Sequence, residues 1–226
     1  MATYPLTWDA AADRVYETGV KRGVLYPTAD STHVGGFKDG VAWNGLTAVT
    51  ESPSGAEETA LYADDIKYLS LRSAEEFGAT VEAYTYPDAW MACDGTIEAE
   101  TGVTIGQQKR NTFGLCYRTV VGDAEGNEHY KLHLIYGGTA SPSERAYQTV
   151  NDSPEAITFS WEIKTTPTAF TTEKYKNYKP TACITIDSEK AGEENMTALE
   201  EILYGKTSTP ARLPSPDEVL AMFATA

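Results

Sequence analysis

The chain has 226 residues, 41% of them hydrophobic and 23% charged, which suits one large folded domain or two small ones. Its 33 acidic residues outnumber 18 basic ones and give a formal net charge of −15, which argues against gripping nucleic-acid phosphates. Cys93, Cys116 and Cys183 are widely spaced, so neither a disulfide framework nor a cysteine zinc site is predicted.

Turn signals come early in the chain. Lys21-Arg22-Gly23 favours a turn between two strands, and Asn44-Gly45 favours a type I′ turn, in which both central residues take positive φ. Residues 27–58 are rich in Gly, Ser, Thr and Pro and are too long for an ordinary hairpin loop. Because long loops in compact domains are usually functional or ordered by a partner, this segment is a candidate contact region.

Alternation with period two dominates the middle of the chain. Within residues 155–164, Ile157, Phe159, Trp161 and Ile163 fall on one face, a pattern typical of a half-buried antiparallel strand. Further strands are predicted over residues 66–71, 78–86, 114–121, 130–136 and 181–187. Residues 122–127 combine Gly, Asp and Asn, which predicts a hairpin loop between two of these strands.

Helical spacing is found mainly near the C-terminus. A helix is predicted over residues 193–204, ending before Gly205. A shorter one is predicted over residues 215–223, with Ser215 as N-cap and Glu218 closing a capping box. One more helical turn is predicted at residues 87–92. The chain therefore reads as one strand-rich domain, residues 1–226, with a long early loop and helices packed late.

The sequence carries no pattern of a catalytic, metal or cofactor site. His129 and His133 lie in one predicted strand about 13 Å apart, too far to share an ion, and His33 has no visible partner. Neither a phosphate-binding loop nor a GxSxG motif is present. Acid pairs such as Glu57-Glu58 indicate a solvated surface. We therefore expect no enzyme and no cofactor.

Two alternatives from other classes remain open. Trp8, Trp43 and Trp90 lie outside the clearest strands and suit the stacking platforms of a carbohydrate-binding β-sandwich, or else core and interface anchors. A hydrolase built on paired carboxylates would need two carboxyl groups roughly 5–10 Å apart, which sequence alone does not test. The N-terminus lacks a signal-peptide pattern, and no apolar run reaches the roughly 18 residues of a membrane helix.

Four segments in order carry a resemblance to a known family. They are YADDIKYLSLRSAEEFGATVEAYTYPD (62–88), GVTIGQQKRNTFGLCYRT (102–119), VNDSPEAITFSWE (150–162) and RLPSPDEV (212–219). With them the chain resembles, roughly from Val15 to Val219, the major tail protein of long-tailed bacteriophages, which is the tail tube subunit.

The resemblance implies a mainly β fold of two packed antiparallel sheets, a flanking α-helix and a short C-terminal helix. It implies a structural virion protein without catalytic residues or cofactor, assembled in the host bacterial cytoplasm without a membrane. Six copies would form a ring whose inner sheets join into a barrel, and rings would stack into a tube. Its partners would be the tape-measure, tail tip and tail terminator proteins, and DNA would cross the lumen without specific binding.

The resemblance also indicates where copies touch. The long inter-ring loop at residues 27–58 is expected to reach the adjacent ring, with Trp43, Asn44 and Leu46 at the contact. The alternative is an ordinary hairpin packed on its own subunit. An N-terminal arm over residues 1–14 and a C-terminal helical arm over residues 188–226 are the other candidates. Their proposed contact residues are Trp8, Val219, Leu220 and Phe223. A net negative lumen would repel DNA phosphates.

Overall fold

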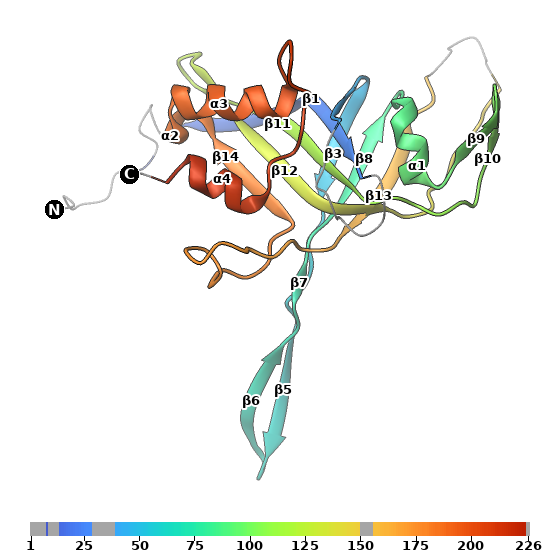
Figure 1. The fold of residues 1–226 in the computed structure, drawn as a ribbon. Coiled ribbons are helices and arrows are strands. Elements are labelled where there is room, and N and C mark those ends of the chain that lie inside the picture. Colours follow the sequence, from blue (N-terminus) through green and yellow to red (C-terminus); the bar gives the residue numbers. More distant parts are fainter. Residues whose placement is uncertain (1–7, 9–13, 29–38, 150–155, 225–226) are drawn as a thin grey trace.

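A computed structural model describes residue 8 and residues 14–28, 39–149 and 156–224 of the chain. Strands predominate, as predicted (Figure 1). They are β1 (Val15–Pro27), β2 (Val41–Trp43), β3 (Leu46–Glu51), β4 (Ser54–Gly55), β5 (Glu58–Ala63), β6 (Ile66–Arg72), β7 (Glu75–Glu76), β8 (Gly78–Ala83), β9 (Ile97–Glu100), β10 (Val103–Ile105), β11 (Phe113–Asp123), β12 (Glu128–Ala140), β13 (Phe159–Thr165) and β14 (Cys183–Asp187). The helical elements are η2 (Asp88–Trp90), α1 (Met91–Asp94), α2 (Ser188–Ala191), α3 (Glu193–Tyr204) and α4 (Pro216–Met222).

One large antiparallel sheet forms the body. Its strand order is β2-β1-β11-β12-β13-β8-β3, and β14 also pairs with β12. The sheet folds over itself, since β2 and β3 are consecutive in the chain yet lie at opposite ends of this order. A Cβ added at Gly23 in β1 would come within 2.9 Å of the Leu46 side chain in β3, so a larger residue at position 23 would require Leu46 to shift. The predicted packed antiparallel layers are therefore halves of one sheet.

An aromatic core fills the space between the two layers. Trp43, Trp90 and Trp161 are all nearly inaccessible to solvent and pack with ring centroids 4.7–5.7 Å apart. Tilted and edge-on contacts of this kind match the ring quadrupoles and add to the stabilisation from buried area. Leu115 of β11 and Ile163 of β13 complete the contact between the layers.

The other face of the sheet is covered by helices. Leu132 and Leu134 of β12 pack with Leu199 and Leu203 of α3, and Val219 of α4 belongs to the same cluster. Ile135, which follows Leu134 in the chain, belongs to the aromatic core instead. Alternating side chains of β12 are thus buried on both faces, and residues 132–136 are all buried.

The predicted helix ends agree with the structure. Gly205 follows α3 with a φ of 76°, and Ser215 and Glu218 form the capping box of α4. In the capping box two backbone N–H groups of the first turn find side-chain acceptors. Among the described residues, no helix is both long and apolar enough to span a membrane.

Three early predictions were wrong. Lys21-Arg22-Gly23 is no turn, because β1 continues through it with register shifts that place Arg22 at a φ of 52°. At Asn44-Gly45 only the glycine takes a positive φ, so the turn is not type I′, and it joins two edge strands that do not pair. Residues 27–58 are not one loop, since β2, β3 and β4 lie within them.

Candidate functional site

The most distinctive feature of the molecule is a long β-ribbon, residues 52–77, hereafter the arm. Figure 1 shows it extending from the body, with β4 and β7 at its base and β5 and β6 at its end. The backbone N–H of Ser52 donates to the Gly78 carbonyl at 2.8 Å, which continues the pairing from the body into the arm. Strands β5 and β6 pair only with each other among the described strands.

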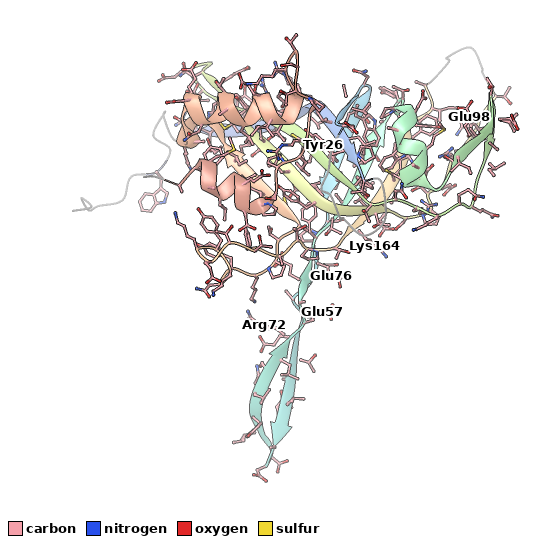
Figure 2. The ribbon with its side chains drawn as sticks, viewed as in Figure 1. Tyr26, Glu57, Arg72, Glu76, Glu98 and Lys164 are labelled. Carbon is pink, nitrogen blue, oxygen red and sulfur yellow. The ribbon has the colours of Figure 1, made fainter. Side chains whose placement is uncertain are left out.

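The arm carries large apolar side chains that are exposed. The exposed fraction is 71% for Tyr62, 67% for Ile66 and 70% for Tyr68, and Leu61, Leu69 and Leu71 are also exposed. Figure 2 shows the arm's side chains projecting into open space on both sides of the ribbon. A two-stranded ribbon is marginal on its own in water, and contiguous exposed apolar surface marks an interaction site.

The tip of the arm is acidic. Lys67 and Arg72 both approach Glu58, at 2.7 and 3.5 Å, and the hydrogen bond from Lys67 lowers the pKa of that carboxyl group. Asp64 and Asp65 form no ion pair with another described residue. Both take positive φ, 50° and 60°, in the turn where Asn-Gly is the usual pair. The tip therefore retains two carboxylates at positions where the backbone favours glycine.

A basic pocket lies at the edge of the body. It has a volume of about 670 Å³ and is lined by β1 residues, by the β2–β3 turn and by Tyr204. Lys21 and Arg22 supply its positive charge, and Arg22 lies 3.6 Å from Glu200. Val20 and Leu46 supply an apolar wall. A pocket with cationic and apolar lining suits an acidic segment that also carries apolar side chains.

The three predicted contact residues of the early loop all line this pocket. Asn44 is exposed and Leu46 is half-buried, so both offer surface to a partner. The ring of Trp43, however, is only 3% exposed, and its indole N–H donates to the Thr85 carbonyl at 2.9 Å. Trp43 therefore belongs mainly to the core of its own chain, because the aromatic cluster between the layers holds it.

The predicted contact residues at the termini differ in exposure. Val219, on the buried face of α4, is 1% exposed, so it packs within its own chain. Leu220 and Phe223 are half-buried, and Phe223 packs against the same helical cluster. Trp8 is 77% exposed. Of the N-terminal segment predicted to make contacts, residues 1–14, only Trp8 and Arg14 belong to the described residues. The part of 188–226 that is described packs on the sheet.

Sequence reasoning located the arm only in part. The predicted inter-ring segment ends at residue 58, where the outer ribbon begins, and the strand predicted at 66–71 is its second strand. The stretch ETALYADDIKYLSLR carries the missing signal, since two runs rich in large apolar residues flank an Asp-Asp turn. That pattern indicates a hairpin, but it does not show whether the hairpin leaves the body.

His133 of β12 belongs to a polar cluster on the sheet. Its ring stacks on Tyr117 with centroids 4.6 Å apart, and Nε2 lies 3.0 Å from the Thr119 hydroxyl. Glu17 and Glu51 flank it at 3.6 and 3.4 Å. Burial lowers the pKa of His133 and outweighs the opposing effect of the two carboxylates. The imidazole of His133 therefore contacts side chains of β11, β1 and β3, and the cluster serves as a contact between strands of the sheet.

The cysteines and tryptophans carry little reactive or sugar-binding surface. Burial raises the pKa of Cys93 to about 12 and that of Cys183 to about 11, so their thiolates are scarce at neutral pH. Trp43 and Trp90, two of the three candidate stacking platforms, lie in the core, whereas Trp8 is exposed. The structure therefore offers no array of exposed tryptophans among the described residues.

A search of protein-family models found no match to this chain, and a search of curated proteins found none either.

Proposed function

We propose that the chain is a structural, self-assembling subunit that forms a tube, and that the tube is the tail tube of a long-tailed bacteriophage. The observation that carries the proposal is the arm, which exposes large apolar side chains along a ribbon that leaves the body (Figure 2). Another copy of the chain would cover this surface. The four sequence segments that resemble tail tube subunits supply the more specific identity.

The contact between copies is of the head-to-tail kind. The arm and the basic pocket are different surfaces, so a copy that uses both continues a series of contacts instead of ending in a closed pair. The tip residues Asp64 and Asp65 would enter the pocket beside Lys21 and Arg22, and the apolar residues behind them would meet the pocket wall. Pairing these charges uses basic groups that are scarce in a chain with a net charge of −15.

The rest of the assembly follows the resemblance. Six copies form a ring, rings stack around a lumen, and a tape-measure protein sets the length between tail tip and terminator. DNA passes through the lumen during ejection, and acidic residues that face it repel the phosphates. Assembly takes place in the bacterial host's cytoplasm, the finished protein resides in the virion tail, and no catalytic step is involved.

Charge reversal tests this proposal. Changing Asp64→Lys and Asp65→Lys together is expected to raise the concentration needed for assembly at least about tenfold, because like charges facing each other at an interface cost several kcal/mol. Lys21→Glu with Arg22→Glu is expected to have the same effect. A chain carrying both pairs of changes is expected to regain much of its assembly. Sedimentation and light scattering measure the assembled fraction.

The matched control is Glu98→Lys with Glu100→Lys, on the separate β9–β10 ribbon, which makes the same change in net charge. Assembly of this control is expected to exceed that of the arm-tip variant clearly. If the arm-tip variant and the control lost assembly equally, the loss would come from the change in net charge and not from the contact of the tip. If each single pair abolishes assembly without rescue by the combination, the tip and this pocket do not meet.

A further inference from the structure

A second cluster lies on the body, where strand β12 begins. His129 is on β12, Asp187 ends β14, and Glu189 is in the first turn of α2. The antiparallel register aligns Lys131 with Asp187, so the chain beyond Asp187 passes alongside His129. His129 Nε2 lies 3.8 Å from an Asp187 carboxylate oxygen and 3.7 Å from a Glu189 carboxylate oxygen. Residues 58 positions apart thus converge through sheet pairing.

The charge in this cluster is poorly balanced. No described Lys or Arg forms an ion pair with Asp187 or Glu189, and the imidazole of His129 is the partner that the structure gives both. The potential ligand atoms of the three side chains all lie within 4.8 Å of one another. Two carboxylates and an imidazole nitrogen that face one point, without another cation between them, form an arrangement that favours a bound cation.

We propose that His129, Asp187 and Glu189 bind a divalent cation of the first transition row, of the class of Zn²⁺, Co²⁺ or Mn²⁺. The imidazole selects this class over Ca²⁺ and Mg²⁺, which prefer sites made of oxygen alone. A tetrahedral ion with bonds of about 2.1 Å needs donor atoms about 3.4 Å apart. The distances of 3.7 and 3.8 Å from the imidazole nitrogen exceed this spacing by a few tenths of an ångström, and the two carboxylate oxygens lie within 4.8 Å of each other, so the Glu189 side chain would move to complete the site.

The surrounding structure holds the side chains of Asp187 and His129 in place and leaves that of Glu189 free to adjust. The Asp187 oxygen nearest His129, Oδ1, also accepts hydrogen bonds from the backbone N–H of Glu189 at 3.0 Å and of Lys190 at 3.4 Å, which fixes the carboxylate as the N-cap of α2. His129 is fixed by the strand, and its side chain is 25% exposed. The Glu189 side chain is 70% exposed, so it can move onto the ion.

The ligand set would leave room at the ion. His129 and Glu189 both line a cavity of about 550 Å³ that is open to solvent and also lined by Glu193 and Thr197. Three protein ligands on one side of an ion leave at least one position for water. Binding would join the start of β12 to α2, so the ion is expected to stabilise this end of the sheet.

Cobalt binding tests the proposal, because tetrahedral Co²⁺ absorbs visible light when bound to a protein. The wild-type chain is expected to bind one Co²⁺ with a visible band that Zn²⁺ removes, and calorimetry is expected to show one Zn²⁺ per chain. His129→Ala is expected to weaken binding at least about tenfold. Removing a residue that only hydrogen-bonds to a metal ligand already costs about that much affinity, and His129 would be a ligand itself. Thermal unfolding of the wild type, but not of this variant, should shift upward with Zn²⁺.

Two further variants separate the ligand role from other effects. Asp187→Asn keeps a good helix N-cap yet removes the charge, so it is expected to weaken binding while the chain stays folded. Glu193→Gln changes a carboxylate that lines the same cavity outside the ligand set, and it is expected to leave binding nearly unchanged. Absence of stoichiometric binding to the wild type, or equal affinity of wild type and His129→Ala, would overturn the proposal.

Discussion

A chain in which residues 58–72 are replaced by a two-glycine turn is expected to fold normally and to lose assembly. The backbone N–H of Ser73 donates to the Glu57 carbonyl at 3.1 Å, so the ribbon is already closed at that level and a short turn can end it there. Strands β5 and β6 pair with each other in the described structure, and the large sheet keeps all of its strands. Removing them takes away exposed apolar surface and the acidic tip together.

Light scattering and thermal unfolding, measured on the same sample, check this expectation. The shortened chain should be monomeric at concentrations where the wild type assembles, and its melting temperature should stay within a few degrees of the wild-type monomer. Assembly at the wild-type concentration would show that the arm is dispensable for self-association. A large loss of stability would show that the arm supports the body, contrary to its exposure.

Trp161→Ala is expected to lower the free energy of unfolding by about 3–5 kcal/mol, the range for removing a large aromatic side chain from a core. Trp161 is 1% exposed and packs against Trp43 of β2 and Trp90 of η2, with ring centroids 5.7 and 5.3 Å away. The change leaves a cavity between the layers that the folded sheet cannot easily close. In a domain of this size each kcal/mol lowers the melting temperature by roughly 2–4 °C.

Urea unfolding below the assembly concentration, followed by tryptophan fluorescence, measures this effect. Trp8→Ala is the matched control, since that side chain is 77% exposed, and its change should stay within about 0.5 kcal/mol. A loss below about 1 kcal/mol in Trp161→Ala would contradict a shared aromatic core. It would mean that the two layers do not depend on each other at this point.

The elements of the body were largely predictable because their signals are local. Ala79, Val81 and Ala83 alternate with polar residues in β8, and all three are buried as that pattern indicates. Ser215 and Glu218 predicted the start of α4 because a capping box depends on residues only three positions apart. The mainly β fold with its C-terminal helix follows from such patterns together with the resemblance.

Long-range arrangement was less predictable. Trp43 has the features of an interface anchor, and only the meeting of β2 with the opposite layer makes it a core residue. The arm strands carry apolar residues on both faces, as buried strands do, although both faces are exposed. His129 was compared with His133 on its own strand, whereas its neighbours Asp187 and Glu189 come from β14 and α2. In each case the deciding contact joins distant parts of the chain.

Electron microscopy of the purified wild-type protein over a range of concentrations, with light-scattering mass measured in parallel, tests self-assembly most directly. The proposed function predicts rings and hollow tubes with a regular axial repeat, and a mass that rises with concentration. A chain that stays monomeric up to the highest attainable concentration, with the arm intact, would contradict it.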